Sequence, residues 1–163
     1  MDFLAANGFE PATAQALPFS RRQYHAGPTG PVLPAPRAEI LLDSVRGDTR
    51  KLRLRLLPAH LGDDLTLQLP DSIAKASVRV DGEPLSASRW PWWHGVTLLA
   101  TPAEGITVAF AAPAGEPFEA YLVGETHGLP AASAGVADAR DAVATQAHGG
   151  DRTAAFRKLT WLP

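Results

Sequence analysis

The sequence contains no cysteine. Disulfides, cysteine-based metal sites and thiol catalysis are therefore excluded for this chain. An excess of charge of either sign is also missing, since 15 basic side chains stand against 17 acidic ones and the formal net charge is −2. With no basic field and no acidic tail, we expect no nucleic-acid partner.

Long hydrophobic runs are missing as well. The most apolar region, Val96–Ala114, is interrupted by Pro102, Glu104 and Pro113. We therefore expect no membrane span in this chain. The N-terminus has no basic segment followed by an apolar run, so no signal peptide is visible. For a protein outside the cytoplasm, the export signal would have to lie in sequence that this chain does not include.

Known catalytic and metal-binding motifs are absent too. The histidines form neither a His-Glu-x-x-His motif nor a closely spaced pair, and a loop with His148 and Asp151 is more typical of an exposed turn than of a ligand set. No serine lies in a Gly-x-Ser-x-Gly elbow, and the prolines around Gly27 and Gly30 cannot donate amides to a phosphate. We predict no catalytic residue and no metal ligand here. A catalytic triad or carboxylate pair assembled only by the fold remains an alternative.

The composition is that of one ordinary globular domain preceded by a different kind of segment. The chain has 163 residues, of which 45% are hydrophobic and 20% charged. Residues 1–36 are rich in proline, and we interpret them as a linker or extension with a few apolar anchors. These prolines are Pro11, Pro18, Pro28, Pro31, Pro34 and Pro36, and the anchors are Phe3, Phe9, Leu17 and Phe19.

Residues 37–163 change to a period of two, which is typical of half-buried strands. Leucines alternate with cations over residues 51–56 and with polar residues over 65–69. Further strands are predicted at Ala38–Val45, Ser77–Val80, Val96–Leu99, Ile106–Phe110, Phe118–Val123 and Ala155–Trp161. Gly-containing turns separate many of them at intervals near ten residues, at Gly47-Asp48, Asp81-Gly82, Glu104-Gly105 and Gly115-Glu116. This pattern predicts an all-β fold, an antiparallel β-sandwich with a Pro-rich N-terminal extension and a long excursion at residues 128–152.

Two short motifs have a structural interpretation. Arg46-Gly47-Asp48 is the tripeptide that integrins read, but it falls between two predicted strands, where glycine and aspartate are the usual turn residues. The Asp63-Asp64 pair follows Gly62, and we expect it to lead from a turn into a strand.

A cluster of aromatic residues is the one concentrated feature of the sequence. Trp90-Pro91-Trp92-Trp93-His94 holds three of the four tryptophans. In a strand, Trp92 and Trp93 would point to opposite faces, so that one would be exposed and free to stack on a sugar ring or dock a partner. Alternatively, the cluster closes one end of the sandwich. Trp92, Trp93 and His94 are therefore the candidate ligand or partner surface.

A family resemblance enters in the second half of the chain. Tyr121-Leu122-Val123, Gly128-Leu129-Pro130 and Gly150-Asp151-Arg152-Thr153 before a last strand resemble the C-terminal domain of bacterial membrane-bound di-zinc aminopeptidases, the aminopeptidase Y-like metallopeptidase family twenty-eight. Arg46–Arg50, leading into the leucine-rich strand, resembles the opening strands of that domain. The resemblance covers about 120 residues.

The resemblance implies an N-terminal zinc peptidase domain, several transmembrane helices and a last β domain on the periplasmic face. The family's di-zinc site uses a His-x-Asp motif and a Glu-Glu pair, and this sequence contains neither. We therefore expect a non-enzymatic accessory domain, with zinc in the parent protein and no cofactor in this chain. It would pack on the peptidase domain of the same polypeptide, gate access to it, or support a homo-oligomer. The alternative is a carbohydrate- or peptide-binding module centred on the tryptophans.

Overall fold

The fold is described from a computed structural model. The structure describes residues 10–11, 25–26, 34–85, 95–128 and 152–163. The chain divides into two compact units, one of residues 1–33 with 127–153 and the other of residues 34–126 with 154–163. In the first unit, strands β1 (Glu10–Pro11) and β2 (His25–Ala26) pair antiparallel, with Glu10 opposite Ala26. Both strands lie within the residues for which the sequence predicts a linker or extension.

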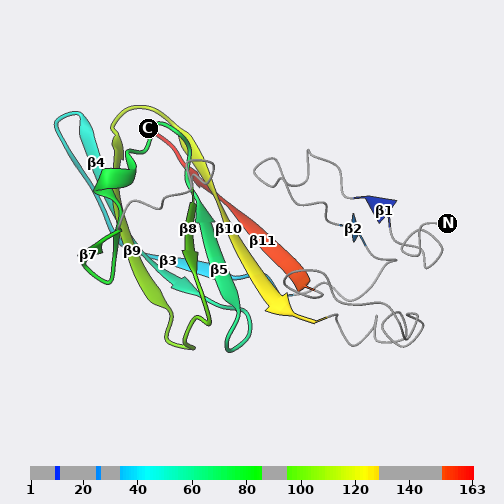
Figure 1. Ribbon diagram of the computed structural model, residues 1–163. Helices are drawn as coiled ribbons and strands as arrows, with labels where there is room; N and C mark the ends of the chain where they lie inside the picture. The colour runs from blue at the N-terminus through cyan, green and yellow to red at the C-terminus, as the bar shows by residue number, and fades with distance from the viewer. Residues whose placement is uncertain (1–9, 12–24, 27–33, 86–94, 129–151) are drawn as a thin grey trace, which may run out of the picture. The chain divides into compact units, whose positions relative to one another are not determined.

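The second unit is built from two antiparallel sheets packed face to face, which confirms the predicted β-sandwich (Figure 1). One sheet has the order β11-β10-β5-β8, and the other has the order β3-β4-β9-β6-β7. The strands are β3 (Arg37–Arg46), β4 (Thr49–Leu57), β5 (Asp64–Gln68), β6 (Arg79–Val80), β7 (Glu83–Pro84), β8 (Gly95–Leu98), β9 (Ile106–Pro113), β10 (Phe118–His127) and β11 (Arg152–Trp161).

Strand β4 supplies one side of the core, as its alternating sequence predicts. Leu52, Leu54 and Leu56 are at most 1% exposed, whereas the cations between them are exposed. Leu54 lies opposite Val108 of β9 in the same sheet. From the other sheet, Leu65, Leu67, Val96 and Leu122 complete the core. Each such side chain contributes about 1.5–3 kcal/mol when it is fully buried.

An aromatic group closes the core where the chain ends. The rings of Phe118 and Trp161 are stacked, with centroids 4.8 Å apart and planes inclined by 15°. Phe110 meets both rings edge-on at 6.3 Å. Trp161 lies on β11 and is only 5% exposed. The packing of this side chain therefore holds β11 in place, in addition to the hydrogen bonds that pair β11 with β10.

The predicted turns and most of the predicted strands are present. Gly47 and Asp48 form the two-residue turn of the β3–β4 hairpin, and Gly47 has a φ of 58°, which such tight hairpin turns require of their first residue. The strand prediction over Ser77–Val80 is wrong in its first half. Lys75–Ser77 form a 3₁₀ turn, in which the Ser77 hydroxyl donates to the Ala74 carbonyl, and only Arg79–Val80 pair. None of the residues that the structure describes forms a helix with the length and hydropathy that crossing a bilayer requires.

Candidate functional site

The tryptophan surface predicted from the sequence lies outside the described residues. Trp92, Trp93 and His94 belong to residues 86–94, so their role as a ligand or partner surface stays a prediction. The structure describes the strands on either side of this segment. Strand β7 is the last strand of the five-stranded sheet, and β8 is the last strand of the four-stranded sheet. The segment thus connects an edge of one sheet to an edge of the other.

A cluster of polar contacts lies where the β4–β5 loop meets the turn after β8. Its centre is Asp63, whose side chain is only 2% exposed. One carboxylate oxygen of Asp63, Oδ2, accepts a hydrogen bond from the backbone N–H of His60 at 2.8 Å. The other, Oδ1, accepts one from the Thr126 hydroxyl at 2.7 Å, at the end of β10. Both oxygens therefore have a protein donor, as a buried carboxylate requires.

Backbone hydrogen bonds join the two loops at the same place. The Thr101 N–H donates to the Asp63 carbonyl at 2.9 Å, and the Gly62 N–H donates to the Thr101 carbonyl at 3.3 Å. Next to them, Asp64 Oδ1 accepts from the Ala100 N–H at 2.9 Å. Ala100 has a φ of 49°, a left-handed conformation that is unfavourable for a residue with a side chain. The Asp63-Asp64 pair, expected from the sequence only to begin a strand, thus also fixes the neighbouring turn.

The two fixed loops hold two exposed leucines, and we call residues 60–64 with 99–101 the leucine corner. Leu61 is 80% exposed and Leu99 is 73% exposed. Leu61 directly precedes Gly62, and Leu99 directly precedes Ala100, so both side chains project from backbone held by the hydrogen bonds above.

The polar groups of the leucine corner include a histidine beside a buried carboxylate. The Nδ1 atom of His60 lies 3.5 Å from Asp63 Oδ2, close enough for an ion pair when the imidazole is protonated. The hydroxyl of Thr101 belongs to a side chain with 0% exposure and has no hydrogen-bond partner, so it is sheltered from any substrate. In the described ranges, no group of three or more histidine, aspartate or glutamate side chains is placed to hold a metal ion.

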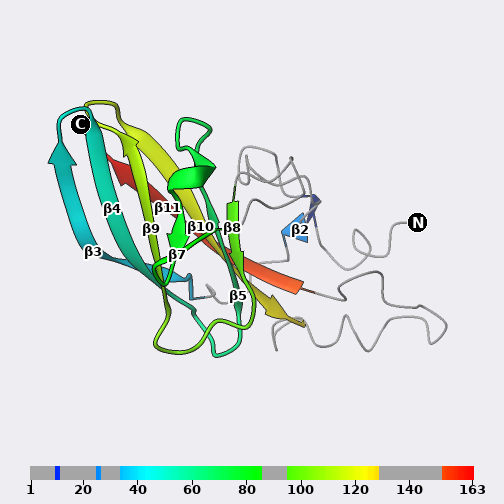
Figure 2. The ribbon, with the colours of Figure 1, turned by 60° about the vertical axis from the view of Figure 1, so that its left-hand side comes forward.

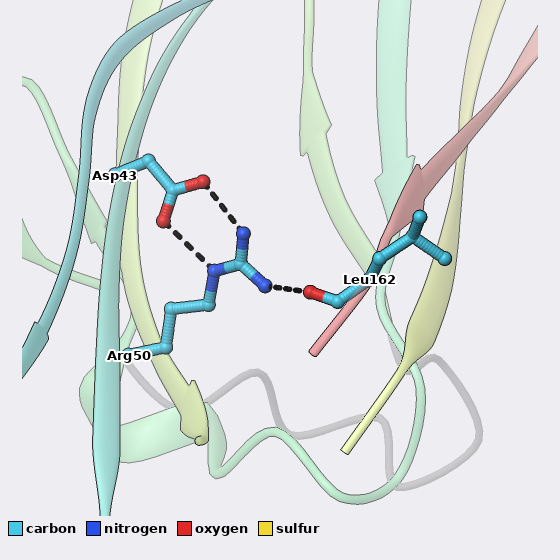
Figure 3. A network of polar contacts seen from close by, with 3 residues as sticks. All are labelled: Asp43, Arg50 and Leu162. Atoms are coloured by element: carbon cyan, nitrogen blue, oxygen red, sulfur yellow. Dashed lines mark hydrogen bonds and ion pairs between the residues drawn. The ribbon is translucent and has the colours of Figure 1, made fainter. Parts of the chain in front are cut away.

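A second polar network ties the end of the chain to the β3–β4 hairpin (Figure 3). The Arg50 guanidinium binds both carboxylate oxygens of Asp43, with Nε 2.8 Å from Oδ1 and Nη2 2.7 Å from Oδ2. Its Nη1 atom donates to the backbone carbonyl of Leu162. A bidentate arginine–carboxylate pair is geometrically specific, so Arg50 fixes Asp43 and the C-terminal residues together. The sequence held no signal for this contact.

The hydrogen bonds from Arg50 lower the pKa of Asp43 below its ordinary value, while partial desolvation opposes the shift. A carboxyl with a lowered folded-state pKa stabilises the protein above its unfolded pKa, and this contribution is lost as the pH falls through the lowered value. In Arg50→Gln, we expect the pKa of Asp43 to rise to its ordinary range. Loss of the Asp43 pair should cost about 0.5–1 kcal/mol near pH 7, because the pair is partly exposed, and this part should fade below about pH 4. Loss of the hydrogen bond to the Leu162 carbonyl does not depend on the ionisation of Asp43, so its cost should persist at low pH.

NMR titration of the Asp43 carboxyl carbon, with urea unfolding at several pH values, measures both effects. Arg55→Gln is the control, because Arg55 lies 3.8 Å from Glu39 and does not contact Asp43. An Asp43 pKa that is unchanged in Arg50→Gln would contradict the proposed cause.

Comparison with known proteins identifies no family: no family model matches the chain, and neither does any curated protein.

Proposed function

We propose that this chain is a non-catalytic accessory domain of a membrane-anchored zinc aminopeptidase, which packs on the peptidase domain of the same polypeptide at the periplasmic face. The proposal starts from the resemblance carried by residues 46–50, 121–123, 128–130 and 150–153. The resemblance implies a β domain in this position, and the chain folds as an antiparallel β-sandwich.

The leucine corner is the observation that carries the proposal. Asp63, Asp64 and their donors are engaged in fixing two loops. The side chains of these loops that reach solvent are Leu61 and Leu99, together with His60 and Ala100. A rigid apolar projection suits contact with another protein surface better than it suits a reaction. This is the arrangement that an accessory domain needs.

The free energy expected for such a contact is suited to a partner domain on the same polypeptide. Complete burial of two leucine side chains contributes roughly 3–6 kcal/mol. Domains of one polypeptide that face the same side of a membrane meet at a raised effective concentration, so a contact too weak to hold free proteins together can keep them associated. The leucine corner would therefore bind a peptidase domain on the same polypeptide, while its affinity for separate proteins would stay low.

Zinc belongs to the peptidase domain in this proposal. The His-x-Asp and Glu-Glu motifs that the family uses for its two zinc ions are missing from this sequence. The residues of this chain therefore do not fit the di-zinc site, and no step of peptide hydrolysis passes through them. Its own contribution would be to position the peptidase domain and to shape access to it.

The purified chain is expected to show no hydrolysis of aminoacyl substrates when zinc or cobalt is supplied, because the residues that would bind the metal lie elsewhere. Release of a chromogenic amine from aminoacyl anilides measures this directly. Turnover that disappears on chelation of the metal would overturn the proposal.

The docking role is tested in the longer protein encoded by the reading frame that contains this chain. That frame should encode the zinc motifs and several membrane spans upstream. Leu61→Glu combined with Leu99→Glu should change kcat/KM of the peptidase and expose the domain junction to limited proteolysis. Leu162→Glu is the matched control, since Leu162 is 69% exposed but lies outside the corner. Equal behaviour of the two variants would argue against docking at the corner.

A further inference from the structure

Among the strands that the structure describes, β3 forms an edge of the five-stranded sheet. In the sheet order β3-β4-β9-β6-β7 it is the first strand, and β4 is its neighbour on one side (Figure 2). It is ten residues long, whereas β7 at the opposite edge has two residues. An edge strand presents a row of backbone N–H and C=O groups that another strand can pair with. A long edge of this kind is a template for strand addition.

The core-facing side of β3 is not covered by the other sheet. Directly paired residues of neighbouring strands point to the same face. Ile40 lies opposite Leu54, and Val45 lies opposite Arg50, so Ile40 and Val45 share the face on which Leu54 is buried. Nevertheless, Ile40 is 59% exposed and Val45 is 61% exposed, whereas Leu54 is 0% exposed. The apolar face of the sheet thus extends beyond the core that covers it.

A bulge adds two more apolar side chains to the same strand. The register shifts between Ile40 and Leu42, which leaves Leu41 as the extra residue. Leu41 is 38% exposed, and Leu42, opposite Arg53 on the outer face, is 41% exposed. Four of the eight large apolar side chains that are exposed among the described residues therefore lie on β3.

The sequence of β3 is complementary to itself in one antiparallel register. If a two-fold axis passes through Asp43, Ile40 of one copy lies opposite Val45 of the other, and the reverse pair forms as well. The same register places Glu39 opposite Arg46, again twice, and both of these side chains point to the outer face, as their partners Arg55 and Thr49 on β4 show. Leu41 and Leu42 together occupy one position of the ladder at the bulge. Side chains on the inner face of one copy therefore lie opposite inner-face side chains of the other copy along the whole strand.

The two groups that meet at the axis are compatible with this register. The two Asp43 carboxylates would approach each other there, and like charges directly opposite in a sheet are unfavourable. Each of them is already held in a bidentate pair by Arg50 of its own chain (Figure 3). A register moved so that Arg37 faces Arg46 would instead bring two uncompensated cations together.

We infer that β3 is the contact between two copies of this chain, which join their five-stranded sheets into one continuous antiparallel sheet with Ile40 opposite Val45. A symmetric contact of this kind closes on itself and stops at a dimer. It brings Ile40 of each copy against Val45 of the other and pairs the backbone groups of the edge. It is independent of the leucine corner and of the proposed function.

The test is sedimentation velocity of the full chain over about a hundredfold range of concentration, supported by the effect of charge reversal. The wild type should pass from monomer to dimer. Val45→Lys places a cation opposite Ile40 at two symmetric positions and should raise the dissociation constant about tenfold. Leu61→Lys, at a more exposed leucine on the leucine corner, should leave it unchanged.

Charge reversal identifies the register. Glu39→Arg and Arg46→Glu should each weaken the dimer, because each creates two like-charge pairs across the contact, and the double variant should restore it. Circular dichroism verifies that each variant is folded, which is expected because both side chains are on the exposed strand. A monomer at all concentrations overturns the inference, and so does a dimer that Val45→Lys leaves intact or one that the double variant does not restore. A bulged edge in such a protein would then serve to prevent pairing.

Discussion

Gly105→Ala is expected to destabilise the protein by about 3–4 kcal/mol. Gly105 has a φ of 78°, a left-handed conformation in which a side chain costs about 1–2 kcal/mol. A Cβ atom at this position would also lie 2.3 Å from the backbone carbonyl oxygen of Leu56 and 2.9 Å from the Leu57 side chain. Leu56 belongs to β4 and is fully buried, so the carbonyl can move only if the core strand moves with it.

Gly115→Ala provides the matched control for this prediction. Gly115 has nearly the same φ, 82°, but a Cβ atom there would meet nothing within 4 Å. Gly115→Ala should therefore lower the free energy of unfolding by about 1–2 kcal/mol, which is the cost of the left-handed backbone conformation alone. Urea unfolding of the two variants and the wild type gives both values, and the difference between them isolates the collision with β4. Equal losses in the two variants would show that the turn can shift away from Leu56.

Asp63→Ala is the second change with a large expected effect, about 3 kcal/mol of unfolding free energy. The substitution removes the acceptor of the His60 N–H at 2.8 Å and of the Thr126 hydroxyl at 2.7 Å. Hydrogen bonds to a charged acceptor contribute about 1.5–3 kcal/mol each, and the donors left behind in a partly buried site lose their partners. The loop of residues 60–64 should also loosen, because the Asp63 side chain joins it to β10.

Thr126→Val separates the parts of this effect. It removes only the hydroxyl donor and should cost about 1.5 kcal/mol, about half of the loss in Asp63→Ala. Chemical unfolding gives the stabilities, and hydrogen exchange of the His60 and Thr101 amides reports the loosening of the corner. If Thr126→Val were as destabilising as Asp63→Ala, the bond to the His60 backbone would contribute nothing, and the corner would not depend on Asp63 in the way described.

The two proposals concern different surfaces of the sandwich. The leucine corner consists of loops, and its proposed partner is a domain on the same polypeptide. Strand β3 is an edge of the sheet among the described strands, and its inferred partner is a second copy. Substitutions at Leu61 and Val45 therefore test them separately, and either proposal can fail while the other stands.

Only one turn of the leucine corner was predicted from the sequence, and neither Leu61 nor Leu99 was singled out there. The Gly62-Asp63-Asp64 sequence indicated a turn leading into a strand, and β5 does begin at Asp64. One partner of Asp63, the His60 N–H, is local, but Ala100 and Thr126 lie 36 and 63 positions away from the aspartates that they bind. Side-chain contacts over such separations depend on which strands become neighbours, and no local pattern encodes this.

What the sequence determined by itself was the direction of side chains along each strand. The alternation over residues 51–56 predicted a buried leucine face, and Leu52, Leu54 and Leu56 form it, because the period of two is a local property of an extended backbone. Only the tertiary structure decided how far that face is covered. Ile40 follows the same pattern as Leu54, its partner, and remains exposed because burial depends on where the opposite sheet ends. Likewise, Gly105 and Gly115 are equivalent turn glycines in the sequence, and only the position of β4 makes the first irreplaceable.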